Sequence, residues 1–339
     1  CFARAMRSKT KENQAFSPCF NLPSPAARGI IPPCAGARKG AYRLIANEKR
    51  LTGAGLGHLL ALGTIIIWGT TFIASTVALR TLSPNELLMF RLVIAIAALL
   101  LAKRQKLVLT SRKHEWYMAG AALSGVVLYF LFENIALTYT NSSNCSVIIS
   151  TAPFFVAIAT RIFIREEKLT RSFFLGFVIA IAGVAMVSFA GQELKLNPLG
   201  DGLCILAAIS WAFYSVFIRK LDGHGYPTLL VTRRIFVYSL LFIVPLMPVM
   251  GFHITAADVL ATPTLVSVLF LGLVASALCF VTWNTAVRLI GPIRTSAYIY
   301  LTPAVTIVFA WLILRDPIHP LAIVGAVLTL LGLVISQRR

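Results

Sequence analysis

The stretch Tyr129–Pro153, YFLFENIALTYTNSSNCSVIISTAP, ends one apolar segment, passes through a short polar turn and begins the next apolar segment. A matching stretch, Phe280–Pro303, reads FVTWNTAVRLIGPIRTSAYIYLTP. A single offset of 150 residues aligns Asn134 with Asn284, and it also aligns the two terminal prolines. Two such units in one hydrophobic chain indicate an internal duplication.

The composition is that of a membrane protein. Of the 339 residues, 58% are hydrophobic and 13% are charged, whereas a soluble domain carries about 25% charged residues. The apolar runs are continuous and about 17 to 24 residues long, which is the length of a membrane-spanning helix. The strands of a β-barrel would show alternation instead. We therefore predict an all-α polytopic membrane protein.

Turn and cap residues divide the apolar part of the chain into ten expected spans. Their predicted limits are residues 58–79, 86–102, 116–138, 144–164, 172–190, 201–218, 228–249, 264–287, 293–314 and 320–336. The connections between them are short, so no second soluble domain fits within this part of the chain.

The basic residues are distributed asymmetrically about these spans. With the amino terminus inside, 24 of the 31 Lys and Arg fall on the inner side, three on the outer side and four within spans. This bias follows the positive-inside rule and predicts that both termini are cytoplasmic. It also accounts for the net charge of +19. We expect no nucleic-acid partner, because no basic stripe with interleaved aromatic residues forms a soluble face.

Equivalent residues recur across the two halves of the chain. Trp68 and Arg91 align with Trp211 and Arg234 at an offset of 143 residues. Each half holds five spans, and because five is odd, the second half enters the membrane upside down. Many secondary transporters share this inverted-repeat architecture and place the substrate site near the membrane midplane, between the halves. The expected five-helix repeats are residues 57–192 and 200–337.

Residues 1–56 differ from the rest of the chain. They contain ten Lys or Arg, several Pro, Ser and Gly, and little periodicity, so we predict a disordered basic cytoplasmic tail. A transit peptide is the alternative, since the stretch is rich in Arg and poor in acidic residues. The six Cys and five His of the chain are scattered without metal-ligand spacing. We expect no metal site, no disulfide framework and no cofactor.

Several short motifs occur in the same order in both halves. They are Trp68–Phe72 (WGTTF), Ser83-Pro84 with Arg91, Asn134–Thr140 (NIALTYT), Pro153 and Glu167–Thr170 (EKLT), followed by Trp211, Arg234, Asn284–Ala286 (NTA), Pro303 and Asp316-Pro317. In these residues the chain resembles the EamA-type ten-helix transporters of the drug/metabolite transporter (DMT) superfamily, over about residues 58–336. It departs from the family pattern at Asp316, where Glu is commoner, and at Trp211-Ala212, where a Trp-Gly pair is lost.

The resemblance implies a transporter of small metabolites, often an exporter, in the bacterial inner membrane or a related organelle membrane. It leaves the substrate unspecified.

Glu133 is the carboxylate deepest within a predicted span. On insertion scales such a charge costs about 2.5 to 3.5 kcal/mol, so it usually faces a cavity or a partner. The functional hypothesis is proton coupling or contact with a substrate cation. The structural alternative is a hydrogen bond to a neighbouring helix. Glu133 aligns with Trp283, so this acid is present in one half only.

The paired Asn and Trp residues are further candidates for a substrate site. Asn134 and Asn284 can contact a polar substrate or join two helices, and interhelical bonds of this kind contribute about 0.6 kcal/mol on average. Trp68 and Trp211 lie about 8 to 11 residues into their spans, where cavity lining is more plausible than membership of the aromatic belt. Additional aromatic walls are expected from Tyr214, Tyr298 and Tyr300. Packing is the alternative for all of these rings.

For two arginines and two prolines, a structural role is the first interpretation, and a functional role is the alternative. Arg91 and Arg234 lie near span ends, where they can snorkel or cap a neighbouring helix, and anion recognition is the alternative. Pro153 and Pro303 remove a backbone donor and kink their helices. Each proline is therefore either a static kink or a bending point used in gating.

Three classes of function remain. The first is a secondary carrier of small metabolites, such as amino acids or drug-like compounds, that works by alternating access in the lipid bilayer, with the proton as candidate coupling ion. The second is a membrane enzyme, which is disfavoured because no intramembrane cluster of acids, histidines or a nucleophile–base set is apparent. The third is a scaffold without transport. Direct ATP hydrolysis is disfavoured because the sequence contains no Walker motif.

Overall fold

The computed structural model describes residues 35–140, 142–165, 170–189, 197–251, 261–314 and 320–336. Within these ranges the chain is helical and contains no strand. The α-helices are α2 (Ala35–Ala78), α3 (Pro84–Ala102), α4 (Arg112–Ala122), α5 (Tyr129–Tyr139), α6 (Ser142–Ile149), α7 (Ala152–Phe163), α8 (Arg171–Phe189), α9 (Pro198–Leu221), α10 (Thr228–Ile243), α11 (Met247–Met250), α13 (Thr262–Leu269), α14 (Cys279–Ile290), α15 (Pro292–Ala297), α16 (Thr302–Leu314) and α17 (Pro320–Ser336). The shorter helical types are the π-helices η1 (Leu123–Leu128) and η3 (Phe270–Leu278) and the 3₁₀ helices η2 (Val244–Leu246) and η4 (Tyr298–Leu301).

These helices join end to end into ten spans in the described part of the chain, arranged as two inverted five-helix repeats. Seven spans are long and apolar enough to cross a membrane, and the apolar cores of two others, Arg171–Met186 and Ile323–Ser336, are shorter. The remaining span runs from α15 through η4 to α16. The predicted all-α polytopic fold is confirmed, because long runs of Leu, Ile, Val and Ala leave the backbone no polar partner in lipid other than its own helix.

The basic tail differs from its expectation in one respect. Disorder was expected over residues 1–56, but α2 begins at Ala35. The physical reason is local: the tail's last proline is Pro33, and the residues after it include many good helix formers such as Ala, Arg, Lys, Glu and Leu. Residues 1–34 lie outside the described residues.

Local side chains define where two of the spans begin. The backbone N–H of Ser83 donates to the Glu86 carboxylate over 2.8 Å at the start of α3. The side chain of Asn197 accepts from the backbone N–H groups of Leu199 and Gly200, both at 3.1 Å, at the start of α9. These residues satisfy N–H groups that have no partner within the helix.

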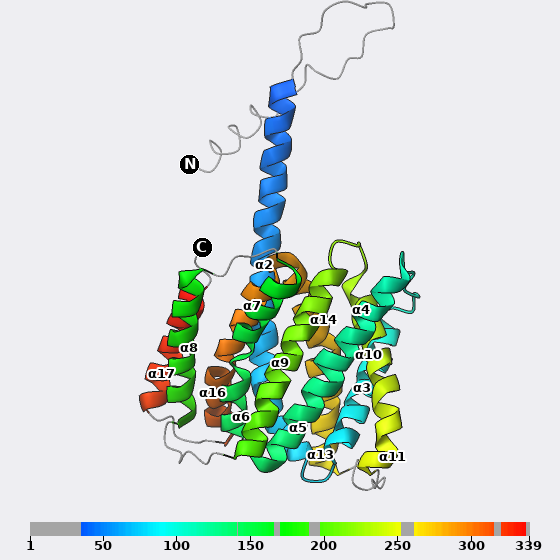
Figure 1. Cartoon of the computed structure of the whole chain (residues 1–339), viewed down its shortest axis with the longest axis vertical. Helices are drawn as coiled ribbons and strands as arrows, with labels where there is room; N and C mark the ends of the chain where they lie inside the picture. Colours follow the sequence, from blue (N-terminus) through cyan, green and yellow to red (C-terminus); the bar gives the residue numbers. More distant parts are fainter. Residues whose placement is uncertain are drawn as a thin grey trace, which may run out of the picture. The chain divides into compact units, whose positions relative to one another are not determined.

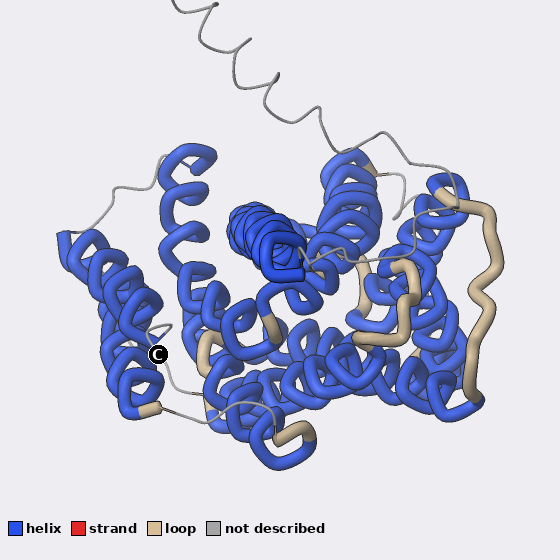
Figure 2. Tube along the Cα trace, turned by 90° about the horizontal axis from the view of Figure 1, so that it is seen from above, coloured by secondary structure: helices blue, strands red, loops and turns tan. Residues whose placement is uncertain are grey.

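The two repeats interlock rather than lie side by side as separate bundles (Figures 1 and 2). Helix α9 of the second repeat packs against α4, η1, α5, α6 and α7 of the first, and α3 of the first packs against η3 and α10 of the second. In the same way, the Thr64 hydroxyl of α2 lies 2.7 Å from the Thr282 hydroxyl of α14. A site at the centre of this arrangement is therefore built from both repeats.

Helices α8 and α17, the last span of each repeat, pack along each other at one edge (Figures 1 and 2). Equivalent glycines make this contact close. A Cβ on Gly183 would lie 2.6 Å from the Gly325 carbonyl oxygen, and a Cβ on Gly332 would lie 2.4 Å from the Ala180 nitrogen. Because any side chain would strike backbone, glycine is required for this approach, as expected of small residues between membrane helices.

Both repeats contain the same two helix irregularities. The π-helices η1 and η3 occupy corresponding places in the third span of each repeat, and π-helices occur frequently at functional sites. In the fourth spans, the first repeat has a break at Ser150–Thr151 just before Pro153, and the second has the 3₁₀ helix η4 just before Pro303. The irregularities therefore recur at equivalent places in the two repeats.

Candidate functional site

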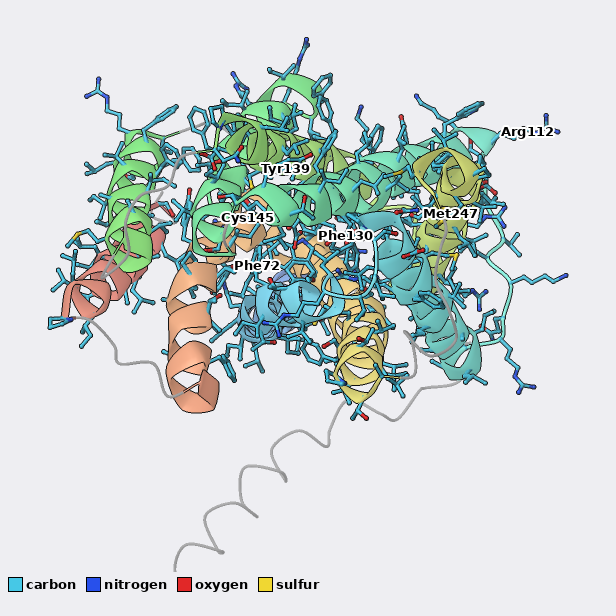
Figure 3. The ribbon with its side chains drawn as sticks, turned by 90° about the horizontal axis from the view of Figure 1, so that it is seen from below. Phe72, Arg112, Phe130, Tyr139, Cys145 and Met247 are labelled. Atoms are coloured by element: carbon cyan, nitrogen blue, oxygen red, sulfur yellow. The ribbon has the colours of Figure 1, made fainter. Side chains whose placement is uncertain are left out.

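A cavity lies at the centre of the bundle and is lined by both repeats. The cavity itself has a volume of about 40 Å³, and the space among its side chains, including the opening, is about 520 Å³. Its lining residues are Ile65, Trp68, Thr71, Phe72, Arg91, Tyr129, Phe130, Glu133, Ile149, Ala152, Trp211, Phe280, Ile299 and Thr302. Phe72 and Phe130 lie near the middle of the bundle when it is seen from below (Figure 3).

Aromatic rings form most of the cavity wall. The equivalent residues Trp68 and Trp211 meet edge to face, with ring centroids 5.4 Å apart and an interplanar angle of 82°. Phe280 lies 5.7 Å from Trp68 and 6.0 Å from Phe130, and Tyr129 lies 5.1 Å from Trp211. These separations are typical of attractive aromatic pairs. The wall offers flat apolar surface to any ligand that enters.

One ring of the wall is also hydrogen-bonded to the backbone. The Trp68 indole N–H donates to the Ala275 carbonyl over 2.9 Å. Ala275 belongs to the π-helix η3, where the wider turn alters the ordinary pattern of backbone hydrogen bonds. The irregularity in the second repeat thus orients a cavity residue of the first repeat.

Arg91 brings a positive charge to the cavity from α3, and its side chain is 2% exposed. Its Nε donates to the Ser276 hydroxyl over 2.6 Å, and its Cζ lies 3.8 Å from the centre of the Phe130 ring. The Nη1 atom is buried and has no hydrogen-bond partner among the described residues. Arg91 is thus fixed on one side and retains a free donor.

Glu133 brings a negative charge to the same cavity from α5, and it is 3% exposed. Its carboxylate interacts with the Tyr129 hydroxyl, one turn earlier on the same helix face, and with the charge of Arg91. Among the described residues no N–O contact of 4.0 Å or less joins Glu133 to a basic side chain. The cavity therefore holds two opposite charges that do not form a direct ion pair.

The EamA-like transporter family model matches the chain twice, over residues 55–189 and 198–337. The chain belongs to this family. It is therefore a multi-pass membrane transporter, and its two matches correspond to the two repeats of the fold.

Several relatives of this EamA-like transporter are named for what they carry. The chain is 28% identical to a "Probable terminal-alkyne amino-acid exporter" of Streptantibioticus cattleyicolor, with 81% of this chain and 91% of that one covered. It is 27% identical to a "Probable amino-acid metabolite efflux pump" of Salmonella typhimurium, over 82% and 93% of the two chains. An "Uncharacterized transporter" of Archaeoglobus fulgidus is 29% identical over 83% and 97%.

A solved crystal structure shares the fold of this EamA-like transporter. The two align with a TM-score of 0.66 over 83% of this chain and 96% of the other, at 15% sequence identity. At that identity the likeness supports the architecture alone.

Some of the site residues predicted from sequence line the central cavity of this EamA-like transporter, and others do not. Trp68, Glu133 and Trp211 line the central cavity. Arg91, which was predicted from sequence to have a structural role, lines it too. Asn134, Tyr214, Asn284 and Tyr298 do not line it.

The two equivalent asparagines join helices. Asn284 accepts from the Tyr214 hydroxyl over 2.7 Å and donates to the Thr232 hydroxyl over 3.1 Å. Asn134 donates to the Pro84 carbonyl over 3.4 Å, and its own carbonyl oxygen is buried without a partner among the described residues. These contacts join neighbouring helices, and Asn284 in addition lines a second cavity.

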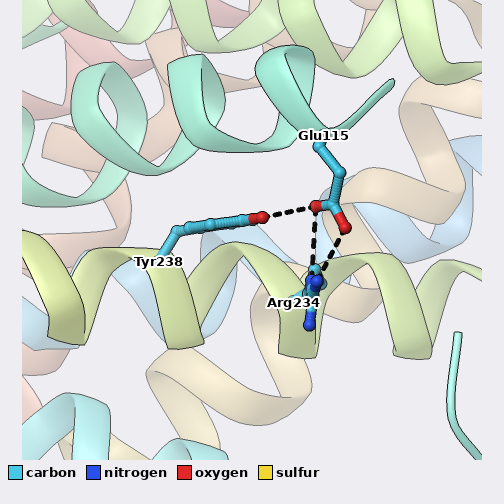
Figure 4. A network of polar contacts seen from close by, with 3 residues as sticks. All are labelled: Glu115, Arg234 and Tyr238. Carbon is cyan, nitrogen blue, oxygen red and sulfur yellow. Dashed lines mark hydrogen bonds and ion pairs between the residues drawn. The ribbon is translucent and has the colours of Figure 1, made fainter. Parts of the chain in front are cut away.

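Tyr298 and Arg234 lie in other surroundings. The Tyr298 hydroxyl is 2.9 Å from Nδ1 of His58. Arg234, half-exposed, pairs with Glu115 at 2.6 Å, and the Tyr238 hydroxyl donates to the same carboxylate over 2.5 Å (Figure 4). Arg234 therefore connects α10 to α4 and takes no part in the cavity.

Several residues of the cavity were not predicted from sequence, among them Phe130 and Phe280. A signal was present, because the offset of 150 that aligns the asparagines also aligns these two phenylalanines. Phe130 also stands three residues before Glu133, on the same helix face. Thr71, Phe72 and Thr302 carried no comparable signal.

A second cavity lies further along the same helices. Its space is about 780 Å³, and its lining residues are Ile218, Leu221, Asp222, Gly223, Gly225, Tyr226, Thr228, Val231, Asn284, Val287 and Arg288. On α14, Phe280 lines the first cavity and Asn284, one turn later, lines the second. Tyr214 and Trp283 are buried, and along their helices they stand between residues of the two cavities: Tyr214 between Trp211 and Ile218 on α9, and Trp283 between Phe280 and Asn284 on α14.

No group of three or more His, Cys, Asp or Glu side chains within the described ranges is arranged to hold a metal ion. The residues that line the central cavity offer charge, hydrogen-bonding groups and aromatic surface.

Proposed function

We propose that this protein is a secondary active carrier that exports small metabolites, such as amino acids or drug-like compounds, by alternating access. The observation that carries the proposal is the central cavity, where the equivalent residues Trp68 and Trp211 of the two repeats meet beside two buried charges. Inverted-repeat carriers place their substrate sites between the repeats in this way. Export is supported by the printed names of two relatives.

The two stacked cavities support alternating access. A substrate that passes from the second cavity to the first must cross the layer of Tyr214 and Trp283 and its hydrogen bond to Asn284. The broken spans at Pro153 and Pro303 are the proposed bending points, since interrupted membrane helices can rearrange around a cavity. Glu133 is the candidate site of proton coupling, because it is the acid within the cavity.

The proposed location is the inner, or plasma, membrane with both termini in the cytoplasm. The distribution of Lys and Arg supports this orientation. It makes the second cavity, which contains the connection between α9 and α10, the cytoplasmic one.

Transport by the purified protein in proteoliposomes tests the proposal. We expect flux of at least one member of a panel of amino acids and amphipathic drugs, and loss of that flux in Trp68→Ala and Trp211→Ala. Trp116→Ala is the matched control, because Trp116 is 77% exposed and lines neither cavity. No flux for any member of a broad panel would favour a scaffold.

Thiol labelling tests the alternating-access part. In a background with the native cysteines replaced by alanine, Thr71→Cys probes the first cavity and Val231→Cys the second. A transported substrate should raise labelling at one position and lower it at the other. Parallel changes at both positions would contradict alternating access.

A further inference from the structure

Two buried cysteines from different repeats face each other beside the central cavity. The Cys204 thiol, on α9, donates to the Cys145 sulfur, on α6, over 3.1 Å. Both residues are 0% exposed, and neither is in a disulfide in this structure. The two lie 59 residues apart in the sequence, so it is the packing of α6 against α9 that brings this thiol pair together.

Apolar side chains surround the thiol pair. The buried cluster that contains it also includes Phe72, Ala136, Ile149 and Ala207. Phe72 and Ile149 line the central cavity as well, and Cys145 lies near Phe72 when the bundle is seen from below (Figure 3). The thiol pair is therefore directly behind the wall of the central cavity.

The thiol pair lies at the end of the central cavity that is opposite the second cavity. Cys204, Trp211 and Ile218 follow one another at intervals of seven residues and so share one face of α9. Trp211 lines the central cavity and Ile218 lines the second. One turn before Cys204, a Cβ on Gly200 would lie 3.1 Å from Cβ of Tyr139, at the end of α5. The contacts of α9 with α5 and α6 thus close the central cavity at this end.

The α6–α9 contact joins the two repeats at a place where alternating access requires movement. In the proposed orientation the second cavity is cytoplasmic, so this contact lies toward the non-cytoplasmic side. A substrate that leaves the central cavity on that side has to pass between helices that the contact holds together. Compartments outside the cytoplasm are also those in which disulfides form and persist.

We infer that Cys145 and Cys204 are a site of reversible oxidative modification, at which a disulfide joins the two repeats and holds the central cavity closed at this end. The sulfur atoms, 3.1 Å apart, need to approach by about 1 Å to reach the disulfide bond length of about 2.05 Å. Formation of the disulfide does not depend on the carrier function. Its effect on transport rests on the proposed alternating access.

The oxidant is a hydroperoxide, which reaches a thiol when the α6–α9 contact opens, because thiols buried in apolar surroundings are inert. One sulfur takes a hydroxyl group from the peroxide as the O–O bond breaks, which gives a sulfenic acid and releases an alcohol, or water from hydrogen peroxide. When the contact closes, the second thiol attacks the sulfenic sulfur. The S–S bond forms as the S–O bond breaks, and the thiol proton leaves with the hydroxyl group as water. The peroxide has then accepted two electrons, and a dithiol restores both thiols by exchange.

Hydrogen peroxide is the probe for this site, applied to the purified full chain in proteoliposomes. After alkylation of the remaining thiols, peptide mass spectrometry should find a peptide pair joined through Cys145 and Cys204, and dithiothreitol should separate it. The initial flux of a transported member of the panel should fall at least about tenfold on oxidation, because a bond about 2.05 Å long keeps the α6–α9 contact from opening. Dithiothreitol should restore that flux.

Variants of the thiol pair assign the effect. Cys145→Ala and Cys204→Ala should each keep flux within about twofold of the unaltered protein, since a buried cysteine packs as a small hydrophobic residue, and neither should respond to peroxide. The use of both covers the case in which one of them does not fold. Cys279→Ala is the matched control, because Cys279 is also buried but hydrogen-bonds to no other thiol in the described structure. This variant should stay as sensitive to peroxide as the unaltered protein.

The site and the carrier function fail separately. The inference is overturned if no joined peptide forms while the same peroxide oxidises glutathione in a parallel vial, or if the joined peptide forms and flux is unchanged. It is also overturned if Cys145→Ala and Cys204→Ala lose flux to peroxide as the unaltered protein does. If the disulfide forms but the untreated protein transports no compound, the carrier proposal fails and the modification site stands.

Discussion

Arg91 and Arg234 occupy equivalent positions in the two repeats but lie in opposite environments. Arg91 is buried in the central cavity, held by Ser276 and by the ring of Phe130. Arg234 is half-exposed at the edge of the bundle, where Glu115 neutralises it (Figure 4). Duplication therefore supplied the same side chain twice, and packing placed it in the central cavity in one repeat and at a contact between two helices in the other.

The largest effect is expected from removing the buried member of this pair. Arg91→Gln should lower the transport rate at subsaturating substrate about 100-fold, because it leaves Glu133 without a counter-charge in a buried site. Arg234→Gln should lower it less than about threefold, since exposed ion pairs contribute about 1 kcal/mol or less. Initial rates of proteoliposome flux measure both. Equal losses would remove the functional difference between the two arginines.

The two acids extend the same comparison. Glu133→Gln should reduce flux roughly 30-fold and flatten its pH dependence, because a buried carboxylate that contacts ligand or proton is lost. Glu115→Gln should keep the pH profile of the unaltered protein, because the side-chain hydrogen-bond partners of Glu115 within the described ranges are Arg234 and Tyr238. Flux measured from pH 5.5 to 8.5 separates the two. A Glu133→Gln protein with unchanged rate and pH dependence would make that residue structural.

At the contact between α8 and α17, glycines of both repeats lie in similar environments, unlike Arg91 and Arg234. Gly183→Ala and Gly332→Ala should each lower the stability by about 1 to 3 kcal/mol, because the new methyl group overlaps backbone atoms of the facing helix. Thermal unfolding in detergent measures this. Gly202→Ala is the control, since nothing lies within 4 Å of its added Cβ. A stable Gly183→Ala protein would show that this contact tolerates separation.

The smallest effect distinguishes the two cavity tryptophans. Trp68→Phe loses the hydrogen bond to the Ala275 carbonyl, which should cost about 1 kcal/mol beyond the change in packing. Trp211→Phe removes an indole N–H that has no partner among the described residues, so this additional cost should be missing. The difference between the two melting temperatures reports the hydrogen bond. Identical shifts would indicate that the bond contributes nothing.

The spans could be predicted closely from sequence because their causes are local. The predicted span 86–102 became α3, Pro84–Ala102, and the predicted span 320–336 became α17. Apolar length and cap residues such as Ser83 and Asn197 set these limits without help from the rest of the chain. In the tail, Pro, Ser, Gly and the lack of periodicity predict disorder, whereas helix propensity after Pro33 is compatible with the start of α2 at Ala35.

The candidate site could be predicted only in part. Glu133 was found because a carboxylate in an apolar span is conspicuous by itself, and the two tryptophans were found because they pair across the repeats. The paired asparagines met the same criteria, yet their hydrogen bonds are with Tyr214, Thr232 and the Pro84 carbonyl. Pairing across repeats reports equivalent positions, and it does not tell a cavity face from a packed face.

The sequence by itself determined that this is a duplicated ten-span membrane protein with inverted halves, because apolar length, turn residues and the spacing of equivalent motifs are properties of the chain alone. Only the tertiary structure decided that Arg91 faces Glu133 across a cavity while Arg234 faces Glu115 at the edge. The physical reason is that the environment of a side chain depends on how its helix is rotated against its neighbours. That rotation is set by interlocking contacts, such as that of Arg91 with Ser276, which lies 185 positions away in the chain.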